Sequence, residues 1–195
     1  MNPPLSHEIP GSEPTDEQVM ARVLGGDTEA FGLIVVRYRE PLGRFIVRYF
    51  RWDPERVQEL VQRSLVKAYE RRGLYDPARP LKPWIYRLAR NLCLDERRSW
   101  KPSVPVEELE NAGSREMDPE QAYVKGERLR RAAAAMERLP QRQREVLSML
   151  WQGLRYGEIA AALDIAESTV RHTARNALAN LAKDTRTAPS VRIGG

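Results

Sequence analysis

Apolar residues between Gln141 and Lys183 recur every three or four positions, which is the spacing of one face of a helix. The pattern falls into three segments and predicts three helices separated by two tight turns. Gly153 ends the first helix, and the turn 163–166 joins the second to the third. The predicted inward-facing positions are Val146, Leu147, Leu150 and Trp151 in the first helix, Ile159, Ala160 and Leu163 in the second, and Val170, Ala174, Ala177 and Leu181 in the third.

The second and third of these helices have the spacing of a helix-turn-helix motif. Asp164 lies in the turn, where it tolerates the left-handed conformation, and Ala160 and Ala161 allow two helices to cross closely. The third helix opens with 167–169, whose hydroxyls can cap it while its first turn faces a major groove. DNA binding is favoured over a plain helical hairpin with a solvated polar face, because turn length, small residues and the basic outer face agree. The side chains predicted to contact bases or phosphates are Ser168, Thr169, Arg171, His172 and Arg175.

The N-terminal part of the chain also has helical periodicity, after a short tail. Residues 1–14 are rich in proline and poor in large apolar groups, so they predict a disordered tail. The segment 15–18 is a capping signal for a first helix, which Gly25 ends. A second helix begins at Asp27, and Pro41 is expected to break or bend it.

A third helix is predicted to begin with Pro54 at its first position and to end at Gly73. The loop 74–83 that follows carries three prolines, so it is stiff as well as exposed. A stiff loop between helices is suited to holding an unstacked base, but a plain tight connection explains it equally well. The next helix is predicted over 84–100.

This fourth helix has an apolar face and an almost purely cationic one. A row of arginines grips phosphates through charge-assisted forks, and Asn91 among them can pair with a base edge. Trp84 and Tyr86 lie beside the stiff loop, where aromatic rings could stack on an exposed base; core packing is the simpler interpretation of Trp84, and a merely solvated surface is the alternative for the arginines. The cationic face carries Arg87, Arg90, Asn91, Arg97 and Arg98.

Charge is distributed unevenly along the 195 residues. The formal net charge of +5 and the pI near 9.5 favour an anionic partner only weakly. The segment 82–101 carries six basic and two acidic residues, whereas 102–120 carries one arginine and six acids. A basic helix followed by an acidic tether is an arrangement that solubility alone does not require.

The composition points away from several other functions. The single cysteine, Cys93, lies among the apolar positions of its helix, so a buried inert thiol is expected and no internal disulfide or cysteine metal site. No run approaches the length of a membrane span and no signal peptide is visible, so a cytoplasmic protein without membrane insertion is expected. No catalytic constellation stands out, and the only histidines, His7 and His172, lie in the tail and on the recognition helix. We expect no enzyme activity, cofactor or metal.

These patterns predict an all-α chain of two small helical domains joined by a flexible acidic linker. The linker has no sustained helical period, and a helix starting at Asp118-Pro119-Glu120 packs on the helix-turn-helix. The predicted divisions are a tail over 1–14, a first domain over 15–100, the linker over 101–118, a helix-turn-helix domain over 119–183 and a tail over 184–195.

Two separate motifs resemble one known family. The helix-turn-helix alone is similar both to the last domain of bacterial sigma factors and to LuxR-type regulators. The run 75–95 resembles the promoter-melting segment of the extracytoplasmic-function (ECF) sigma factors, and 139–147 resembles the start of their last domain. The similarity covers about Asp16–Lys183, with both motifs in the family's order.

The resemblance implies a dissociable initiation subunit of bacterial RNA polymerase. The first domain would bind the clamp helices of the large polymerase subunit and melt the minus-ten element; the second would read the minus-thirty-five element as duplex and meet the flap of the other large subunit. Promoter DNA and an anti-sigma protein are the other implied partners. The implied polymerase-binding residues are Glu59, Leu60, Gln62 and Leu65, and the implied single-strand contacts are Tyr75, Lys82, Trp84, Arg87, Arg90, Asn91, Arg97 and Arg98.

The chain departs from the family pattern at some of these positions. Gln62 is followed by Arg63 where relatives carry an acid, and the recognition helix has Thr173 and Asn176 where relatives are more basic. Phosphorylation at a residue such as Ser64 is one hypothesis for control. The competing interpretations are a stand-alone LuxR-type duplex binder, which leaves the arginine-faced helix unexplained, and a helical enzyme with an incidental basic surface.

Overall fold

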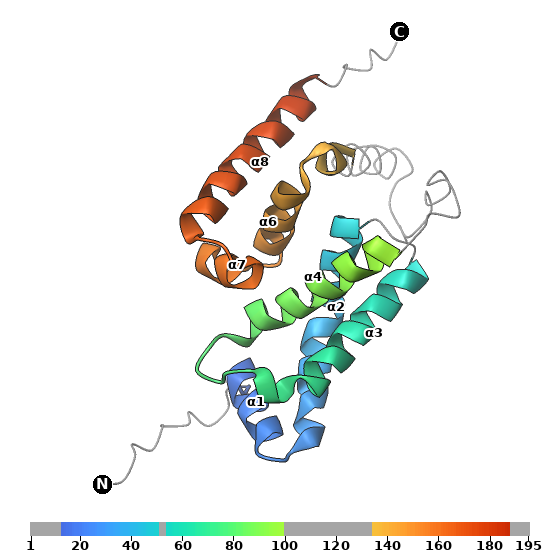
Figure 1. Ribbon diagram of the computed structural model, residues 1–195, viewed down its shortest axis with the longest axis vertical. Helices are drawn as coiled ribbons and strands as arrows, with labels where there is room; N and C mark the ends of the chain where they lie inside the picture. Colours follow the sequence, from blue (N-terminus) through green and yellow to red (C-terminus); the bar gives the residue numbers. More distant parts are fainter. Residues whose placement is uncertain (1–12, 51–53, 100–133, 188–195) are drawn as a thin grey trace, which may run out of the picture.

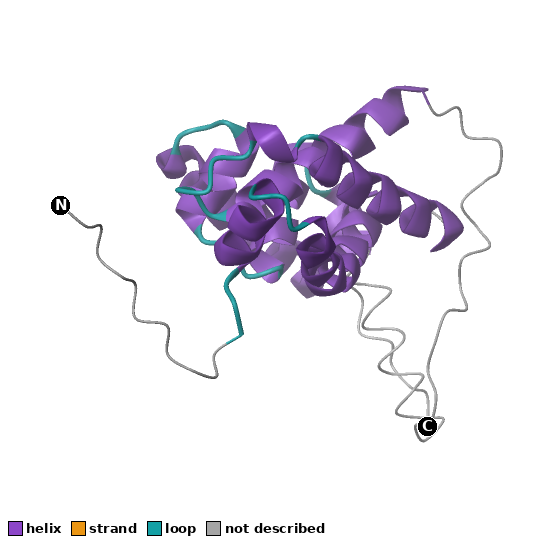
Figure 2. Cartoon of the chain, turned by 90° about the horizontal axis from the view of Figure 1, so that it is seen from below, coloured by secondary structure: helices purple, strands orange, loops and turns teal. Residues whose placement is uncertain are grey.

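The computed structural model describes residues 13–50, 54–99 and 134–187, and every regular element in these ranges is a helix (Figures 1 and 2). The all-α prediction is therefore confirmed for the part of the chain that is described. The predicted acidic linker and the helix start at Asp118 lie outside it. The described N-terminal elements are α1 (Asp16–Leu24), η1 (Thr28–Ala30), α2 (Phe31–Phe50), α3 (Pro54–Glu70), η2 (Arg72–Leu74) and α4 (Leu81–Ser99).

Helix α1 begins where the capping signal predicts. The Thr15 hydroxyl accepts a hydrogen bond from the Gln18 amide at 3.2 Å, and the Gln18 side chain accepts one from the Thr15 amide at 2.8 Å. This reciprocal capping box satisfies two amides that the first turn leaves without helical partners. The buried face of α1 then packs on η1 and α2 through Val19, Met20 and Val23.

Helix α2 is not broken at Pro41. Proline removes one helical hydrogen bond and crowds the preceding turn, so a break was a reasonable expectation. The helix nevertheless runs from Phe31 to Phe50, and Tyr38, Leu42 and Phe45 on both sides of the proline are buried. Burial of this continuous apolar stripe offsets the local cost of the proline.

Helix α4 starts three residues earlier than its predicted start at Trp84. Pro83 lies in its first turn, where amides have no helical acceptor and a proline therefore loses nothing. The Leu81 amide at the start of the helix donates to the Glu17 carboxylate at 3.0 Å, which ties α4 to α1. The stiff loop is correspondingly shorter than predicted.

The C-terminal helices have the predicted helix-turn-helix connection. They are α6 (Gln141–Trp151), α7 (Tyr156–Leu163) and α8 (Glu167–Thr187), preceded by a helical turn at 134–138. Asp164, with φ of 55°, is the only non-glycine residue with positive φ among those described, and Gly153 follows α6 with φ of 77°. One inward position is wrong: the side chain of Trp151 is half-exposed rather than buried.

The two halves share one continuous core. Helix α4 packs against α3 on one side and α7 on the other, and α2 also contacts α6 (Figure 1). Buried Ile159 and Ala162 of α7 belong to the same apolar cluster as Leu88 and Leu92 of α4. The sequence pattern did not predict this contact, because it identifies buried faces but not their partners.

The capping box gives a first testable prediction. Thr15→Ala removes the side-chain acceptor at the start of α1 and should lower the free energy of unfolding by about 1 kcal/mol. Thr15→Ser retains the acceptor and should stay within a few tenths of a kcal/mol of the unmodified chain. Urea unfolding followed by circular dichroism measures both; equal stability of the two variants would show that the cap contributes nothing.

Candidate nucleic-acid interface

The polar face of the recognition helix α8 is open to solvent. Val170 and Ala174 face inward and are buried. Arg171 is held in place, because its guanidinium donates to the Glu167 carboxylate at 3.0 Å through Nε and lies 4.7 Å from the centre of the Tyr156 ring. All five predicted contact residues are exposed, namely Ser168, Thr169, Arg171, His172 and Arg175.

The cationic face of α4 is placed very differently, because the C-terminal helices lie against it. The Arg90 Nε donates to Glu145 Oε1 of α6 at 2.8 Å, and Glu145 is only 1% exposed. The Lys82 ammonium donates to the Gln152 carbonyl at 2.7 Å, and Arg87 donates to the Ala161 carbonyl. Three of the predicted strand-binding cations thus contact the helix-turn-helix part of the chain.

The rest of the predicted strand-binding set is partly accessible. Arg97 and Arg98 near the end of α4 are exposed, and Arg98 lies 3.6 Å from Asp95. Asn91 is also exposed, and its side-chain oxygen accepts from Arg90 at 3.3 Å. The cationic face therefore divides into an open C-terminal end and an N-terminal half whose cations contact the C-terminal helices, although Arg87 stays exposed.

The aromatic residues near the loop mainly hold it together. Tyr75 is 5% exposed; its hydroxyl donates to the Arg79 carbonyl at 2.5 Å, and its ring centre lies 5.3 Å from that of Trp84. Burial raises the pKa of Tyr75 to about 12, so the phenol stays a neutral donor. Tyr86 is fully buried against Phe45. Trp84 is half-buried, whereas Tyr75 and Tyr86 are buried, so Trp84 has the most accessible ring of the three in this conformation.

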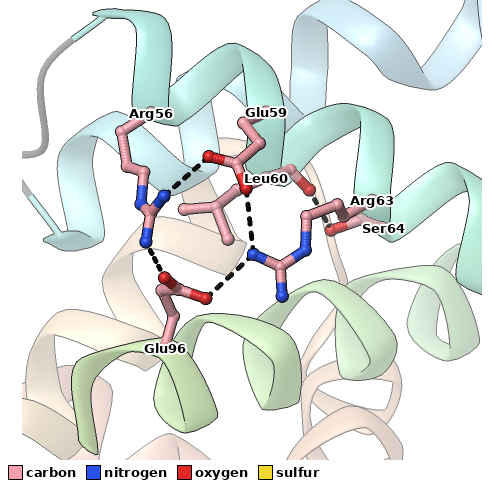
Figure 3. A network of polar contacts seen from close by, with 6 residues as sticks. All are labelled: Arg56, Glu59, Leu60, Arg63, Ser64 and Glu96. Atoms are coloured by element: carbon pink, nitrogen blue, oxygen red, sulfur yellow. Dashed lines mark hydrogen bonds and ion pairs between the residues drawn. The ribbon is translucent and has the colours of Figure 1, made fainter. Parts of the chain in front are cut away.

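The unusual arginine on α3 belongs to a cluster of charges that joins α3 to α4 (Figure 3). Arg63 lies 3.2 Å from the Glu59 carboxylate and 2.9 Å from Glu96 of α4. Arg56 completes the cluster, pairing with Glu59 at 2.7 Å and with Glu96. The charges of the two arginines and the two carboxylates cancel, so Arg63 does not make this surface strongly cationic.

The same view corrects the phosphorylation hypothesis. Ser64 is fully buried, and its hydroxyl donates to the Leu60 carbonyl one turn earlier at 2.6 Å (Figure 3). A kinase needs the hydroxyl in an accessible, extended segment, and a phosphate on it would place charge in the apolar core. Ser64 is therefore not a modification site in the folded chain.

An apolar groove runs between α2 and α3 on the side away from α4. It has a volume of about 960 Å³, and the predicted residues Gln62 and Leu65 line it, whereas Leu60 lies fully buried beneath. Sequence reasoning missed three exposed valines in the groove, Val36, Val47 and Val66. The available signal was that they are apolar yet lie off the buried stripe of their helices.

Comparison with known proteins gives the same picture as the motifs. Residues 34–101 match the family model "Sigma-70 region 2" and residues 129–181 match "Sigma-70, region 4". A relative from Salmonella typhimurium, "ECF RNA polymerase sigma-E factor", is 32% identical over 189 residues, covering 91% of this chain and 97% of the relative.

Two solved structures share the fold. The structure of CnrH in complex with the cytosolic domain of CnrY has a TM-score of 0.69 at 23% identity, covering 89% of this chain and 99% of CnrH. The sigma factor RpoE of Bartonella quintana, in complex with the anti-sigma factor NepR, has a TM-score of 0.60 at 20% identity, covering 84% of this chain and 99% of that one.

An arginine-faced helix followed by a helix-turn-helix, each within a matching sigma-70 region, defines a transcription initiation factor of the sigma-70 class. The chain belongs to the ECF sigma factors and is an RNA polymerase sigma factor. The family models and relatives support this interpretation and give no support to the LuxR alternative. No helix within 13–50, 54–99 or 134–187 is long and apolar enough to cross a membrane.

The charge cluster in Figure 3 gives a second prediction. Arg63→Glu places a third carboxylate beside Glu59 and Glu96, and should lower the free energy of unfolding by up to about 1 kcal/mol, since Arg63 is partly exposed and solvent screens it. The same reversal at exposed Arg71, outside the cluster, is the control and should change stability less. Thermal unfolding at low and at 1 M salt measures the difference, which salt should shrink. Identical behaviour of the two reversals would contradict the role assigned to the cluster.

Proposed function

We propose that this sigma factor directs core RNA polymerase to specific promoters by reading duplex DNA with α8 and single-stranded DNA with α4. The observation that carries the proposal is the presence of two polar faces on one chain, each within a matching sigma-70 region. One is the exposed face of α8 and the other is the arginine-rich face of α4.

The α8 face is suited to the major groove at the minus-thirty-five element. Its N-terminal turn exposes Ser168 and Thr169, short hydroxyls that accept or donate at base edges, and Arg171 follows one turn on. The Glu167 carboxylate beside Arg171 limits the rotamers of that side chain and so reduces the entropy lost on binding. His172 and Arg175 continue the row toward the phosphates.

The α4 face is suited to the non-template strand of the minus-ten element. Arginines at spacings of three and four along one helix match consecutive phosphates as bidentate donors. Asn91 is exposed among them and supplies both a donor and an acceptor to a base edge. Lys82, Trp84 and the Tyr75 loop lie at the N-terminal end, and Arg97 and Arg98 continue the charge at the other.

We further propose that the groove between α2 and α3 binds the clamp helices of the large polymerase subunit. Exposed apolar side chains on a monomer commonly mark a protein contact, and this groove gathers several of them. Gln62 and Leu65 line the groove and would contact the clamp helices directly. Glu59 lies outside the groove lining, in the charge cluster with Arg56 and Arg63, and would add a polar contact beside it, while buried Leu60 would hold α3 in place. On the other domain, exposed Leu178 of α8 would meet the flap of the second large subunit.

An anti-sigma protein is the proposed regulatory partner. The support is that RpoE of similar fold was solved in complex with an anti-sigma factor. An amphipathic helix of such a partner would fit the apolar groove, and polymerase and anti-sigma would then compete for the same surface. The proposed place of action is the cytoplasm, where polymerase and promoters are found.

The groove assignment gives a third prediction. Val36→Asp places a charge on an apolar contact surface and should weaken affinity for core polymerase at least about tenfold. Leu74→Asp is a matched control, because Leu74 is equally exposed at 77% but lies outside the groove. Fluorescence anisotropy of the labelled chain titrated with bacterial core polymerase measures both. Equal affinities for the two variants would exclude the groove as the clamp contact.

The promoter assignment gives a fourth prediction. Purified core polymerase with this protein should yield discrete run-off transcripts from genomic fragments, and core polymerase alone should not. The double variant Arg90→Ala, Asn91→Ala should abolish them by weakening capture of the melted strand, whereas Arg22→Ala, an exposed arginine on α1, should not. Sequence-specific duplex binding by the protein alone, without transcripts, would instead favour a stand-alone regulator.

A further inference from the structure

We propose that the helix-turn-helix domain closes over the strand-binding face of α4 and inhibits it, with the carboxylate of Glu145 in the place of a DNA phosphate on Arg90. The proposal rests on the function assigned to α4 above and adds a regulation of that same site. It is carried by the side chains that join α4 to α6 and α7.

The central contact is a buried ion pair with a second arginine on its other side. Arg90 donates from both Nε and Nη2 to Glu145 Oε1, each at 2.8 Å, and Arg142 donates to Oε2 at 3.1 Å. Glu145 is 1% exposed and the side chain of Arg90 16%. A guanidinium that grips one carboxylate oxygen through two nitrogens is held as it would be by a phosphate oxygen. The two arrangements exclude each other.

Two further cations of α4 are held by the ends of helices. Lys82 donates to the carbonyl of Gln152, the residue that caps the C-terminus of α6, and Arg87 donates to the carbonyl of Ala161 in the last turn of α7. Carbonyls at a helix C-terminus lack helical partners and carry the negative end of the helix dipole. The helix-turn-helix domain thus presents three acceptors, the Glu145 carboxylate and these two carbonyls, to the cations that we propose bind the DNA strand.

Apolar packing supports these polar contacts. Val146 and Met149 of α6, and Ile159 of α7, are fully buried in the cluster that also contains the apolar face of α4. The recognition residues of α8, by contrast, stay exposed in the same arrangement. The closed chain therefore leaves its duplex-reading face accessible, whereas Lys82, Arg87 and Arg90 of its strand-reading face are held by groups of the helix-turn-helix domain.

Closure has a defined energetic consequence. When only a fraction of the molecules is open, the apparent dissociation constant for single-stranded DNA equals the intrinsic one divided by that fraction. Any partner that holds the domains apart, as polymerase would by binding both, removes this penalty. Strand capture is thereby confined to the polymerase-bound factor.

The test uses the full chain with two spin labels, at Glu70→Cys on α3 and Ala179→Cys on α8. Both positions are exposed and lie outside the proposed contact. The native Cys93 is fully buried, and burial raises the pKa of its thiol to about 12, so it does not compete for the label. Pulsed electron paramagnetic resonance gives the distribution of distances between the labels, and anisotropy with a fluorescent dT20 oligonucleotide gives the strand affinity.

Three variants separate closure from general effects of charge. Glu145→Gln removes the carboxylate charge that holds Arg90. Glu137→Gln, at an exposed residue ahead of α6, makes the same change of net charge elsewhere in the domain. Arg142→Gln removes the second arginine from Glu145 but keeps Arg90 in place, so it should preserve the closed arrangement and serves as the control for perturbing the α6 surface.

We expect one narrow distance distribution for the unmodified chain, Glu137→Gln and Arg142→Gln, and a broad, longer one for Glu145→Gln. Affinity for dT20 should rise at least about fivefold in Glu145→Gln relative to Glu137→Gln. A broad distribution in the unmodified chain, or an unchanged distribution and affinity in Glu145→Gln with the native circular dichroism spectrum, would overturn the proposal.

If Glu145→Gln loses its native structure, Glu145→Asp replaces it in the test. Its shorter side chain should give a distribution of label distances between those of the closed and open chains. A distribution identical to that of the unmodified chain would then overturn the proposed closure. Promoter-dependent transcription by core polymerase tests the underlying function separately. Opening in Glu145→Gln without promoter-dependent transcripts from any variant would refute the proposed function and leave the closure intact.

Discussion

The fold depends on one helix that is covered on both sides. Helix α4 presents an apolar face to the core that it shares with α2 and α3, and cations to the helix-turn-helix domain. Helix α3 also packs against α2, and α7 also packs against α8, but α4 contacts both α3 and α7 and so joins the two halves. Because the same helix carries the arginines assigned to DNA, its packing and its function draw on the same side chains.

Local features of this structure could be read from the sequence, and contacts between distant segments could not. The capping box at Thr15, the turn at Asp164 and the start of α3 at Pro54 depend on residues within a few positions of one another. The pairing of Arg90 with Glu145 joins residues 55 positions apart. The residue pattern of neither helix indicates that the other is its partner. The sequence shows the cationic residues of α4, but not their partners in the folded chain.

Tertiary packing outweighs local preference at two positions. Pro41 does not interrupt α2, since buried side chains on either side keep the helix continuous. Ser64 was one candidate for phosphorylation, whereas the structure buries its hydroxyl, which donates to the Leu60 carbonyl one turn earlier. Two acids lie beside Arg63: Glu59 is one turn earlier on α3, whereas Glu96 lies on α4 and could not be inferred from the sequence of α3 alone.

The buried carboxylate on α6 also constrains how such a factor can change over generations. A substitution at Arg90 that suited a different promoter would leave the buried Glu145 carboxylate with Arg142 but without Arg90, and removing one partner of a buried ion pair is destabilising. Relatives that differ at one of the two positions should therefore differ at the other. Promoter preference in the first domain is then inherited together with a residue of the second, although that residue touches no DNA.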